Sequence, residues 1–276
     1  MTMRSAAVLL TVLLSAAGLA PAAAQVADAT SHDALRVCAD PSAWPASGRE
    51  QPGYENKIAE LMAARLERPL EYTWFPMATG FVRKTLRDKR CDVIIGYAQG
   101  DELVQNTNAY YTSTHVMIVK AGGPLAAITS LDDPALKDKV VGVIAGTPPA
   151  SHLARVGLLG KARPYQLFAD RAVVNSADQM LDDLESGQID VAILWGPQGG
   201  PMAKARDGLT VIPLLGDTPA PKLFYRITMG VRPGEDDWKR QLNSLIRRNQ
   251  DDIDRILIEA GVPVTDDYGT ALKAAP

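Results

Sequence analysis

Cys91-Asp92-Val93-Ile94-Ile95-Gly96 is a short apolar run that follows an acidic residue and ends in glycine. The same pattern returns later in the chain as Ile189-Asp190-Val191-Ala192-Ile193-Leu194-Trp195-Gly196. Runs this short and this uniformly apolar are typical of strands that are covered on both faces, as in parallel sheets. The repetition predicts two similar α/β lobes rather than one large sheet.

The segments before the first run alternate between strand and helix patterns. Leu35–Asp40 and Leu70–Phe75 carry the β-branched and aromatic residues of strands, whereas Asn56–Leu66 and Gly80–Arg90 place apolar residues at helical spacing. This alternation predicts a parallel sheet with right-handed crossovers and the strand order 2-1-3.

The segments around the second run repeat the alternation. Val140–Ile144 predicts a strand, and helices are expected from about Ala150 and over Ser176–Ser186. Towards the C-terminus, Arg226–Val231 predicts a further strand and Asp236–Ala260 one long amphipathic helix with a charged turn inside it.

The composition excludes several classes of protein. The chain has 276 residues, of which 46% are hydrophobic and 22% charged, so it is too apolar for a disordered tail. Its formal net charge of -3 gives no basic surplus for binding nucleic acid or anionic lipid. This length accommodates two lobes that each have a core.

The N-terminus has the features of a secretory signal peptide over residues 1–24. Arg4 supplies the positive charge, Ala6–Ala20 is apolar, and Ala22–Ala24 gives the small residues of a cleavage site. An uncleaved membrane anchor is the alternative, but the apolar stretch is short for the roughly 20 residues of a membrane span. We therefore expect cleavage before Gln25 and export to a bacterial periplasm, with no membrane span in the mature protein.

The order of motifs resembles the periplasmic solute-binding proteins of ABC importers, in their amino-acid-binding branch. The stretches that carry the resemblance are Tyr110-Tyr111, Ser130-Leu131-Asp132-Asp133, Val140–Thr147 and Gly187-Gln188-Ile189-Asp190. The resemblance implies a periplasmic binding protein type II-like α/β fold, with two doubly wound lobes, a two-segment hinge and a cleft between the lobes. It places lobe 1 at 25–118 and 225–276, including the C-terminal helix, and lobe 2 at 119–224. The hinge segments are expected near Met117–Lys120 and Phe224–Thr228.

Three stretches are similar to a narrower group, the MxaJ/XoxJ type. They are Gly53–Leu61, Gly80–Gly96 and Tyr225–Lys239. Members of this group accompany PQQ-dependent (quinoprotein) methanol dehydrogenases, so the resemblance implies a role in methanol oxidation in a methylotroph. The implied partner is a periplasmic quinoprotein methanol or alcohol dehydrogenase, with its cytochrome c as a further candidate. Between calcium- and lanthanide-dependent partners, the resemblance leans towards the lanthanide branch.

The two clamps of an amino-acid binder are missing. Such a protein holds the ligand carboxylate with an Arg that follows the third strand, and the ammonium with an acid at the end of the later strand. No Arg lies between Cys91 and Arg155, and the place of the acid is taken by Trp195, Gly196 and Pro197.

Aromatic and apolar side chains are expected to line the cleft instead. In a doubly wound sheet, ligands meet the loops at the carboxyl ends of the strands. The candidates for cleft or partner binding at these ends are Asp40, Trp44, Tyr54, Phe75, Met77, Phe81, Tyr97, Gly146, Thr147 and Trp195. The alternative for each large side chain is burial in the core under the loops, and it applies most to Phe75.

Catalysis and metal binding have little support in the sequence. His32, His115 and His152 are scattered, and Ser151 directly precedes His152, which is poor geometry for a nucleophile and its base. Gly146 could hold an anion at a helix start, but Pro148 and Pro149 remove two N–H donors there. We expect no catalytic residue, no metal and no cofactor in this chain.

Cys38 and Cys91 fall on neighbouring strands of the predicted sheet. A disulfide between them is compatible with an oxidising compartment. However, Cys38 is late in its strand and Cys91 early, so two buried free thiols remain the alternative.

The sequence therefore predicts a non-enzymatic accessory protein, monomeric when free, that binds and helps mature or activate the dehydrogenase. The alternative is an importer binding protein for a small uncharged or apolar solute. A hydrolase or dehydratase on the same fold lacks a coherent acid–base pair.

Overall fold

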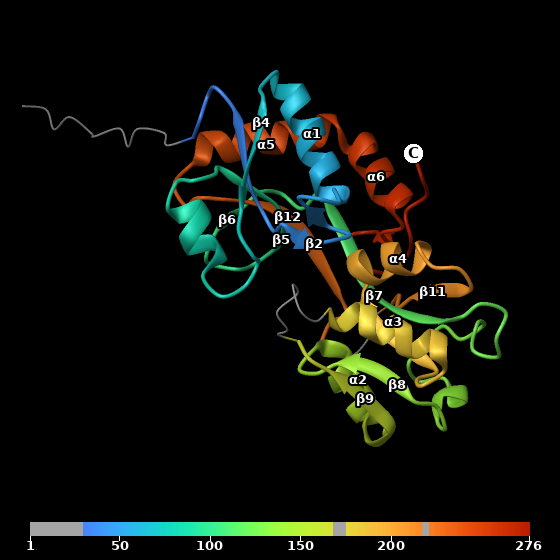
Figure 1. Cartoon of the computed structure of the whole chain (residues 1–276). Coiled ribbons are helices and arrows are strands. Elements are labelled where there is room, and N and C mark those ends of the chain that lie inside the picture. Colours follow the sequence, from blue (N-terminus) through green and yellow to red (C-terminus); the bar gives the residue numbers. More distant parts are fainter. Residues whose placement is uncertain (1–29, 168–174, 217–220) are drawn as a thin grey trace, which may run out of the picture.

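The computed structural model describes residues 30–167, 175–216 and 221–276. Two lobes are joined by strands that pass from one to the other (Figure 1). The expected signal peptide, residues 1–24, lies outside the described residues. Within these ranges, no helix is long and apolar enough to cross a membrane.

The sheet of lobe 1 begins with three parallel strands in the predicted 2-1-3 order. These are β4 (Leu70–Trp74), β1 (Leu35–Ala39) and β5 (Val93–Ala98). The sheet continues through antiparallel strands, namely β12 (Phe224–Val231), β7 (Tyr111–Lys120), β6 (Gln105–Asn106) and β13 (Val264–Thr265). A separate hairpin is formed by β2 (Ser42–Ala43) and β3 (Ser47–Gly48).

The strands of lobe 1 are buried on both faces, as the uniform apolar run predicts. In β5, Val93 and Ile95 belong to one core and Ile94 to the other, because successive side chains point to opposite faces. The larger core lies under α1 (Tyr54–Leu66), α5 (Asp236–Arg248) and α6 (Gln250–Ala260), which Figure 1 shows together at the top of the molecule. The smaller core lies beside the π-helical turn η1 (Arg83–Arg87).

Lobe 2 repeats this arrangement. Its sheet runs β7-β10-β8-β9, with β11 also paired to β7. The strands are β8 (Val141–Ile144), β9 (Ala162–Tyr165), β10 (Val191–Trp195) and β11 (Leu209–Pro213). The helices are α2 (Pro148–Arg155), α3 (Ser176–Ser186) and α4 (Gly196–Lys204), with the 3-10 turns η2 (Pro134–Leu136) and η3 (Leu159–Lys161). Val191 and Ile193 face one core, whereas Ala192 and Leu194 face the other.

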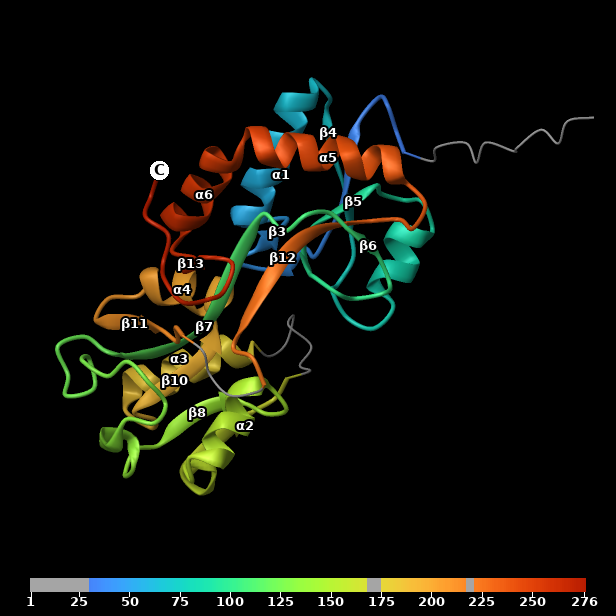
Figure 2. The same ribbon diagram turned by 180° about the vertical axis from the view of Figure 1, so that it is seen from behind.

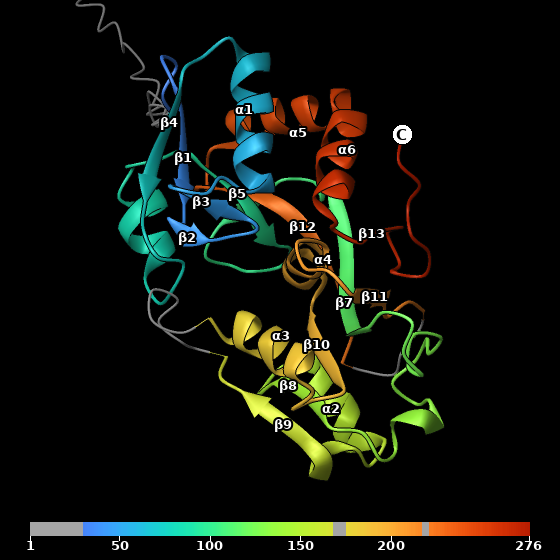
Figure 3. The same ribbon diagram turned by 45° about the vertical axis from the view of Figure 1, so that its right-hand side comes forward.

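Strand β7 serves both lobes. Its residues 111–114 pair with β12 of lobe 1, whereas 115–118 pair with β10 of lobe 2. The chain returns at Leu223, whose carbonyl accepts a hydrogen bond from the backbone N–H of His115 at 2.9 Å. Figure 2 shows β7 and β12 side by side at this crossing, and Figure 3 shows the lobes above and below it.

The change of partner therefore falls at Thr114–His115, ahead of the segment Met117–Lys120 that the sequence suggests. One unbroken strand carries the chain across, so no break in the residue pattern marks the place. The expected lobe limits at 118 and 224 remain predictions.

The prediction of one long C-terminal helix is wrong. The stretch expected as one helix is divided into α5 and α6 at Asn249, whose φ of -122° and ψ of 22° are not helical. The Asn249 side chain donates to the Leu245 carbonyl at 2.8 Å and accepts from Arg65 Nε of α1 at 2.7 Å. Asparagine competes for backbone hydrogen bonds in this way, which favours a break here.

Cys38 and Cys91 form a disulfide in the structure, with their Cα atoms 5.4 Å apart. Both cysteines are buried in the smaller core of lobe 1. Cys38 is aligned with Ile94 in the ladder, and Cys91 lies just before β5 begins. The bond therefore fastens the start of β5 to the neighbouring strand.

Candidate functional site

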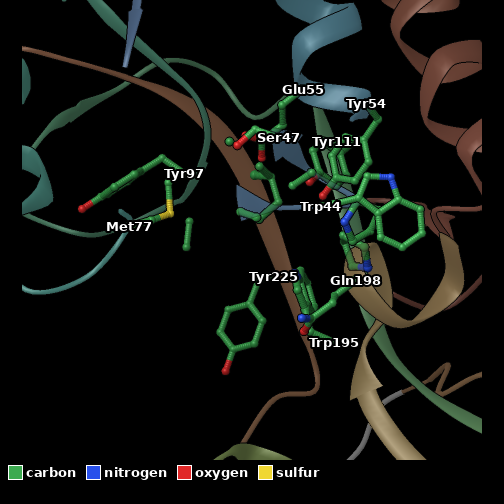
Figure 4. A pocket seen from close by; sticks show the side chains of 17 residues that line it. Trp44, Ser47, Tyr54, Glu55, Met77, Tyr97, Tyr111, Trp195, Gln198 and Tyr225 are labelled. Atoms are coloured by element: carbon green, nitrogen blue, oxygen red, sulfur yellow. The ribbon is translucent and has the colours of Figure 1, made fainter. Parts of the chain in front are cut away.

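A pocket with a volume of about 360 Å³ opens between the two lobes. Its walls are mainly aromatic and apolar. Figure 4 shows its lining residues, which are Ala43, Trp44, Pro45, Ala46, Ser47, Tyr54, Glu55, Met77, Gly96, Tyr97, Ala98, Tyr111, Trp195, Pro197, Gln198, Tyr225 and Ile227. We call it the aromatic pocket. A volume of this size is in the usual range for a small-molecule site, about 300–1,000 Å³.

The aromatic pocket is built from strand ends and helix starts. Tyr97 lies near the carboxyl end of β5, and Trp195 is the last residue of β10. Tyr54 opens helix α1, Tyr111 begins β7, and Tyr225 is the second residue of β12. This is the edge at which doubly wound sheets bind ligands, and both lobes contribute to it.

Glu55 is the one charged residue in the lining of the aromatic pocket, within the part of the chain that the structure describes. It lies in the first turn of α1, where the helix dipole favours a negative charge. A Cβ atom at Gly96 would lie 2.0 Å from Glu55 Oε1, so a larger residue would collide with this carboxylate. Gly96, inside β5, thus makes room for the acid.

Three tyrosines lie beside this acid. Burial raises the pKa of Tyr54, Tyr110 and Tyr111, and the negative charge of Glu55 adds to the effect on each. Burial also raises the pKa of Tyr97, whose hydroxyl donates to Asp101 at 2.9 Å. These hydroxyl groups therefore stay neutral at physiological pH.

A second aromatic cluster lies at the crossing between the lobes. The ring of Trp195 packs edge-on against His115 at 5.2 Å and Tyr225 at 5.6 Å, measured between centroids. His115 Nδ1 lies 2.7 Å from the carbonyl oxygen of Leu223. Burial lowers the pKa of His115 to about 4, so the imidazole is neutral at pH 7 and adds no positive charge next to the pocket.

Half of the residues suggested by the sequence lie in the aromatic pocket. The members that line it are Trp44, Tyr54, Met77, Tyr97 and Trp195. In Figure 4, Trp44 and Tyr54 lie on one side of the view and Met77 and Tyr97 on the other, with Trp195 below.

The other five lie outside its lining. Asp40 is buried and accepts hydrogen bonds from the backbone N–H groups of Ser42 and Met77, which is a structural role. Phe75 packs against the core that contains the disulfide, with Lys84 Nζ 5.3 Å from its ring centroid.

Phe81 is buried in that core and also reaches an outer groove of about 500 Å³ beside η1. Gly146 and Thr147 precede α2 in lobe 2, where Thr147 Oγ1 donates to the Ile144 carbonyl at 2.6 Å. None of these residues contributes to the walls of the aromatic pocket.

Sequence reasoning missed several lining residues, notably Glu55, Tyr111, Gln198 and Tyr225. Glu55 directly follows Tyr54 at a helix start, and that position was a signal that could have found it. Gln198 lies in Gly196-Pro197-Gln198-Gly199-Gly200-Pro201, an unusual composition for a helix, yet α4 begins there.

The described part of the aromatic pocket contains no Lys, Arg or His. A zwitterionic amino acid would therefore find no cation for its carboxylate on these walls. Across the described ranges, no group of three or more His, Cys, Asp and Glu side chains is placed to hold a metal ion.

The fold and the pocket define a two-lobed solute-binding protein of the type II class. The family model for bacterial extracellular solute-binding proteins matches residues 84–250, so the chain belongs to this family.

Within the family, the chain is similar to Protein MoxJ of Methylorubrum extorquens, with 33% identity over 276 residues and 90% of each chain covered. The crystal structure of the periplasmic binding protein XoxJ from Methylobacterium extorquens AM1 is 41% identical. It aligns with a TM-score of 0.72 and covers 84% of this chain and 100% of that chain. The resemblance to the MxaJ/XoxJ type is thereby confirmed.

MxaJ from Methlophaga aminisulfidivorans MPT has the same fold. Its crystal structure aligns with a TM-score of 0.74 at 24% identity, over 84% of this chain and 100% of that chain.

Proposed function

We propose that the protein is a periplasmic accessory protein that binds a PQQ-dependent methanol dehydrogenase and helps to mature or activate it. The observation that carries this proposal is the aromatic pocket of a solute-binding fold whose described lining has no basic residue. Similarity to MoxJ and XoxJ supports the same assignment. The role is one of binding and does not require catalysis by this chain.

The aromatic pocket is suited to a protruding segment of a partner protein. Trp and Tyr side chains offer a large contact area at a low cost in conformational entropy, and they are enriched at protein interfaces. Tyr225 is 38% exposed and therefore accessible from outside. We propose that such a segment of the dehydrogenase is held here while its cofactor or metal is inserted.

The proposal includes the route to the periplasm. Residues 1–24 are removed on export, and the mature chain meets the dehydrogenase, and its cytochrome c, as a monomer. A lanthanide-dependent dehydrogenase is the preferred partner over a calcium-dependent one.

A reconstitution experiment tests the accessory role. The purified protein is added to the cognate apo-dehydrogenase with PQQ and metal, and binding and the fraction of loaded active sites are measured. We expect binding and faster loading with the wild-type chain, and a loss of both with Tyr225→Ala. Tyr268→Ala is the matched control, because Tyr268 is 70% exposed and lies outside the aromatic pocket.

Absence of both binding and any effect on loading would contradict the accessory role. If one uncharged or apolar metabolite instead stabilised the protein strongly in a thermal-shift screen, the importer hypothesis would replace it. A ligand present at roughly 100 times its Kd adds about 2.7 kcal/mol to the free energy of unfolding.

A further inference from the structure

The outer groove beside η1 combines apolar side chains with two arginines. Met77, Phe81 and Leu103 are among the residues that line its volume of about 500 Å³, together with Arg83 and Arg87. Met77 is 38% exposed and Leu103 is 49% exposed, although both side chains are large and apolar. Exposed apolar side chains that gather in a groove indicate a surface that another molecule covers.

The outer groove lies against a concentration of basic charge. Residues 83–90 carry a single acid, Asp88, and five exposed basic side chains, namely Arg83, Lys84, Arg87, Lys89 and Arg90. Among the described residues, no acid forms an ion pair with any of these five. The chain as a whole has a formal net charge of -3, so this basic surface is local. An exposed basic cluster on an acidic protein is suited to an acidic partner.

The outer groove is continuous with the aromatic pocket. Met77 and Tyr97 line both cavities, and Figure 4 shows them on the same side of the aromatic pocket. The junction is held by Asp101, which accepts hydrogen bonds from the Tyr97 hydroxyl at 2.9 Å and from the Leu103 N–H at 2.8 Å. A peptide that leaves the aromatic pocket past Met77 and Tyr97 therefore enters the outer groove.

The two cavities favour different parts of such a peptide. The described lining of the aromatic pocket has no Lys, Arg or His, so its rings favour apolar side chains. The described lining of the outer groove has two arginines and no acid. Because a guanidinium group can hold both oxygens of a carboxylate, Arg83 and Arg87 favour acidic side chains. Asp101 repels acids at the junction, which places them farther along the groove.

We infer that the protein recognises a segment with an apolar part, which fills the aromatic pocket, and an acidic part, which lies in the outer groove on Arg83 and Arg87. This inference rests on the proposed function, in which the aromatic pocket holds a segment of a partner protein, and it adds the chemical character of that segment. The π-helical form of η1, which presents both arginines, is rare in proteins and is frequently found at functional sites.

Three capped peptides test the inference on the purified chain. The first joins an apolar half of Leu and Phe to an acidic half of Asp, the second has Asn in place of Asp, and the third is the acidic half alone. Calorimetry at low ionic strength measures their affinities. We expect the first peptide to bind at least about tenfold more tightly than either of the others, because two linked halves bind as one ligand. Equal affinity of the first two peptides, or no binding of the first up to millimolar concentration, would overturn the inference.

Variants locate the acidic half of the peptide. The double variant Arg83→Gln/Arg87→Gln should bind the first peptide about 2- to 30-fold more weakly and the Asn peptide as the wild type does, because only exposed charge pairs are lost. The difference should shrink at high salt. Arg247→Gln/Arg248→Gln is the matched control, since it removes two exposed arginines of α5 that lie outside both cavities. If the two double variants bind the first peptide equally well, the inference is wrong.

A final arm replaces the peptides by the cognate dehydrogenase and by vesicles of phosphatidylglycerol. Weaker binding of the dehydrogenase to Arg83→Gln/Arg87→Gln than to the control variant would support the inference. Equal binding to both would overturn it and leave the accessory role intact. Failure of the dehydrogenase to bind even the wild type would contradict the accessory role alone, since the peptide measurements are made without it. Vesicles that bind the wild type and not the groove variant would assign the basic surface to a membrane and overturn the inference.

Discussion

Asp92 and Asp190 occupy the same place in the repeated strand motif, yet the two lobes use them differently. Asp92 is 1% exposed and pairs with Arg36 Nε at 2.7 Å and with a terminal guanidinium nitrogen of Arg232 at 2.6 Å. Asp190 is 39% exposed, accepts from the Val140 N–H at 2.8 Å, and lies 3.7 Å from Lys139 Nζ. One acid joins distant parts of the chain, whereas the other fastens neighbouring loops.

The difference follows from how each lobe is assembled. Lobe 1 is made of two separated stretches of chain, and Arg232 comes from the second of them. Trp238 of that stretch also donates its indole N–H to the Asp92 carbonyl at 3.0 Å. Lobe 2 is one continuous stretch, and its acid contacts Val140 and Lys139 of that same stretch. The motif therefore predicts where the acid lies in the strand, but its contribution to stability depends on the residues around it.

The largest expected effect is on the buried ion cluster of lobe 1. Asp92→Asn removes a buried carboxylate that pairs with both Arg36 and the buried Arg232, and we expect a loss of about 3–5 kcal/mol in the free energy of unfolding. Asp190→Asn should cost about 1 kcal/mol or less, because that pair is largely exposed. Urea unfolding of both variants measures the difference, and equal losses would contradict this account.

Removal of the disulfide also acts on lobe 1. Replacing Cys38 and Cys91 by Ser releases a loop with a sequence separation of 53 residues. The chain-entropy estimate for such a loop is about 4 kcal/mol. Unfolding of this double variant, compared with the oxidised wild type, should show that loss. An unchanged urea midpoint of unfolding would mean that the disulfide contributes little to stability.

His115, at the crossing between the lobes, makes the free energy of unfolding depend on pH. Its pKa is 6.5 in the reference state and about 4 when folded, because burial disfavours the charged imidazole. Between these values the unfolded chain binds more protons, so stability falls as the pH is lowered from about 6.5 to 4. The total loss is about 3 kcal/mol.

The measurement is the slope of unfolding free energy against pH, for the wild type and for His115→Gln. The variant should lack this part of the slope, and other titrating groups cancel in the comparison. Identical slopes would show that His115 does not titrate as described.

The smallest expected losses of stability are those caused by alanine at Gly96 and at Gly196, the two glycines that end the repeated motif. A Cβ at Gly196 would meet the backbone carbonyl of Thr114 at 2.2 Å, whereas one at Gly96 would meet the side chain of Glu55. Backbone cannot move aside as a side chain can, so Gly196→Ala should cost about 1–3 kcal/mol. Gly96→Ala should cost less. Thermal unfolding decides the order, and a more costly Gly96→Ala would reverse our reading of these contacts.

The repeated apolar runs were enough to predict two lobes, and the alternation of strand and helix was enough to predict the 2-1-3 strand order. Local chemistry was harder to predict. Asn249 breaks a stretch with helical periodicity through a side-chain bond to Leu245 and a contact with Arg65. Both depend on packing that periodicity does not record.

The aromatic and apolar character of the pocket was predicted from the sequence, but only some of its lining residues were. Trp195 could be placed because it ends a strand next to Gly196 and Pro197. Phe75 directly follows a strand end as well, but its half-buried ring packs against the core that contains the disulfide, a choice that the sequence leaves open. The position of the Glu55 carboxylate depends on the space that Gly96 leaves. These two residues are far apart in the sequence and become neighbours only in the folded chain.

The crossing described for β7 and β12 also has a consequence for the order in which the protein is made. Residues 115–223 are synthesised, and can fold as a continuous unit, before β12 exists to take its place between β5 and β7. Until residue 232 emerges, the sheet of lobe 1 is not complete and Asp92 lacks Arg232. The lobe that begins the chain is thus the last to be completed.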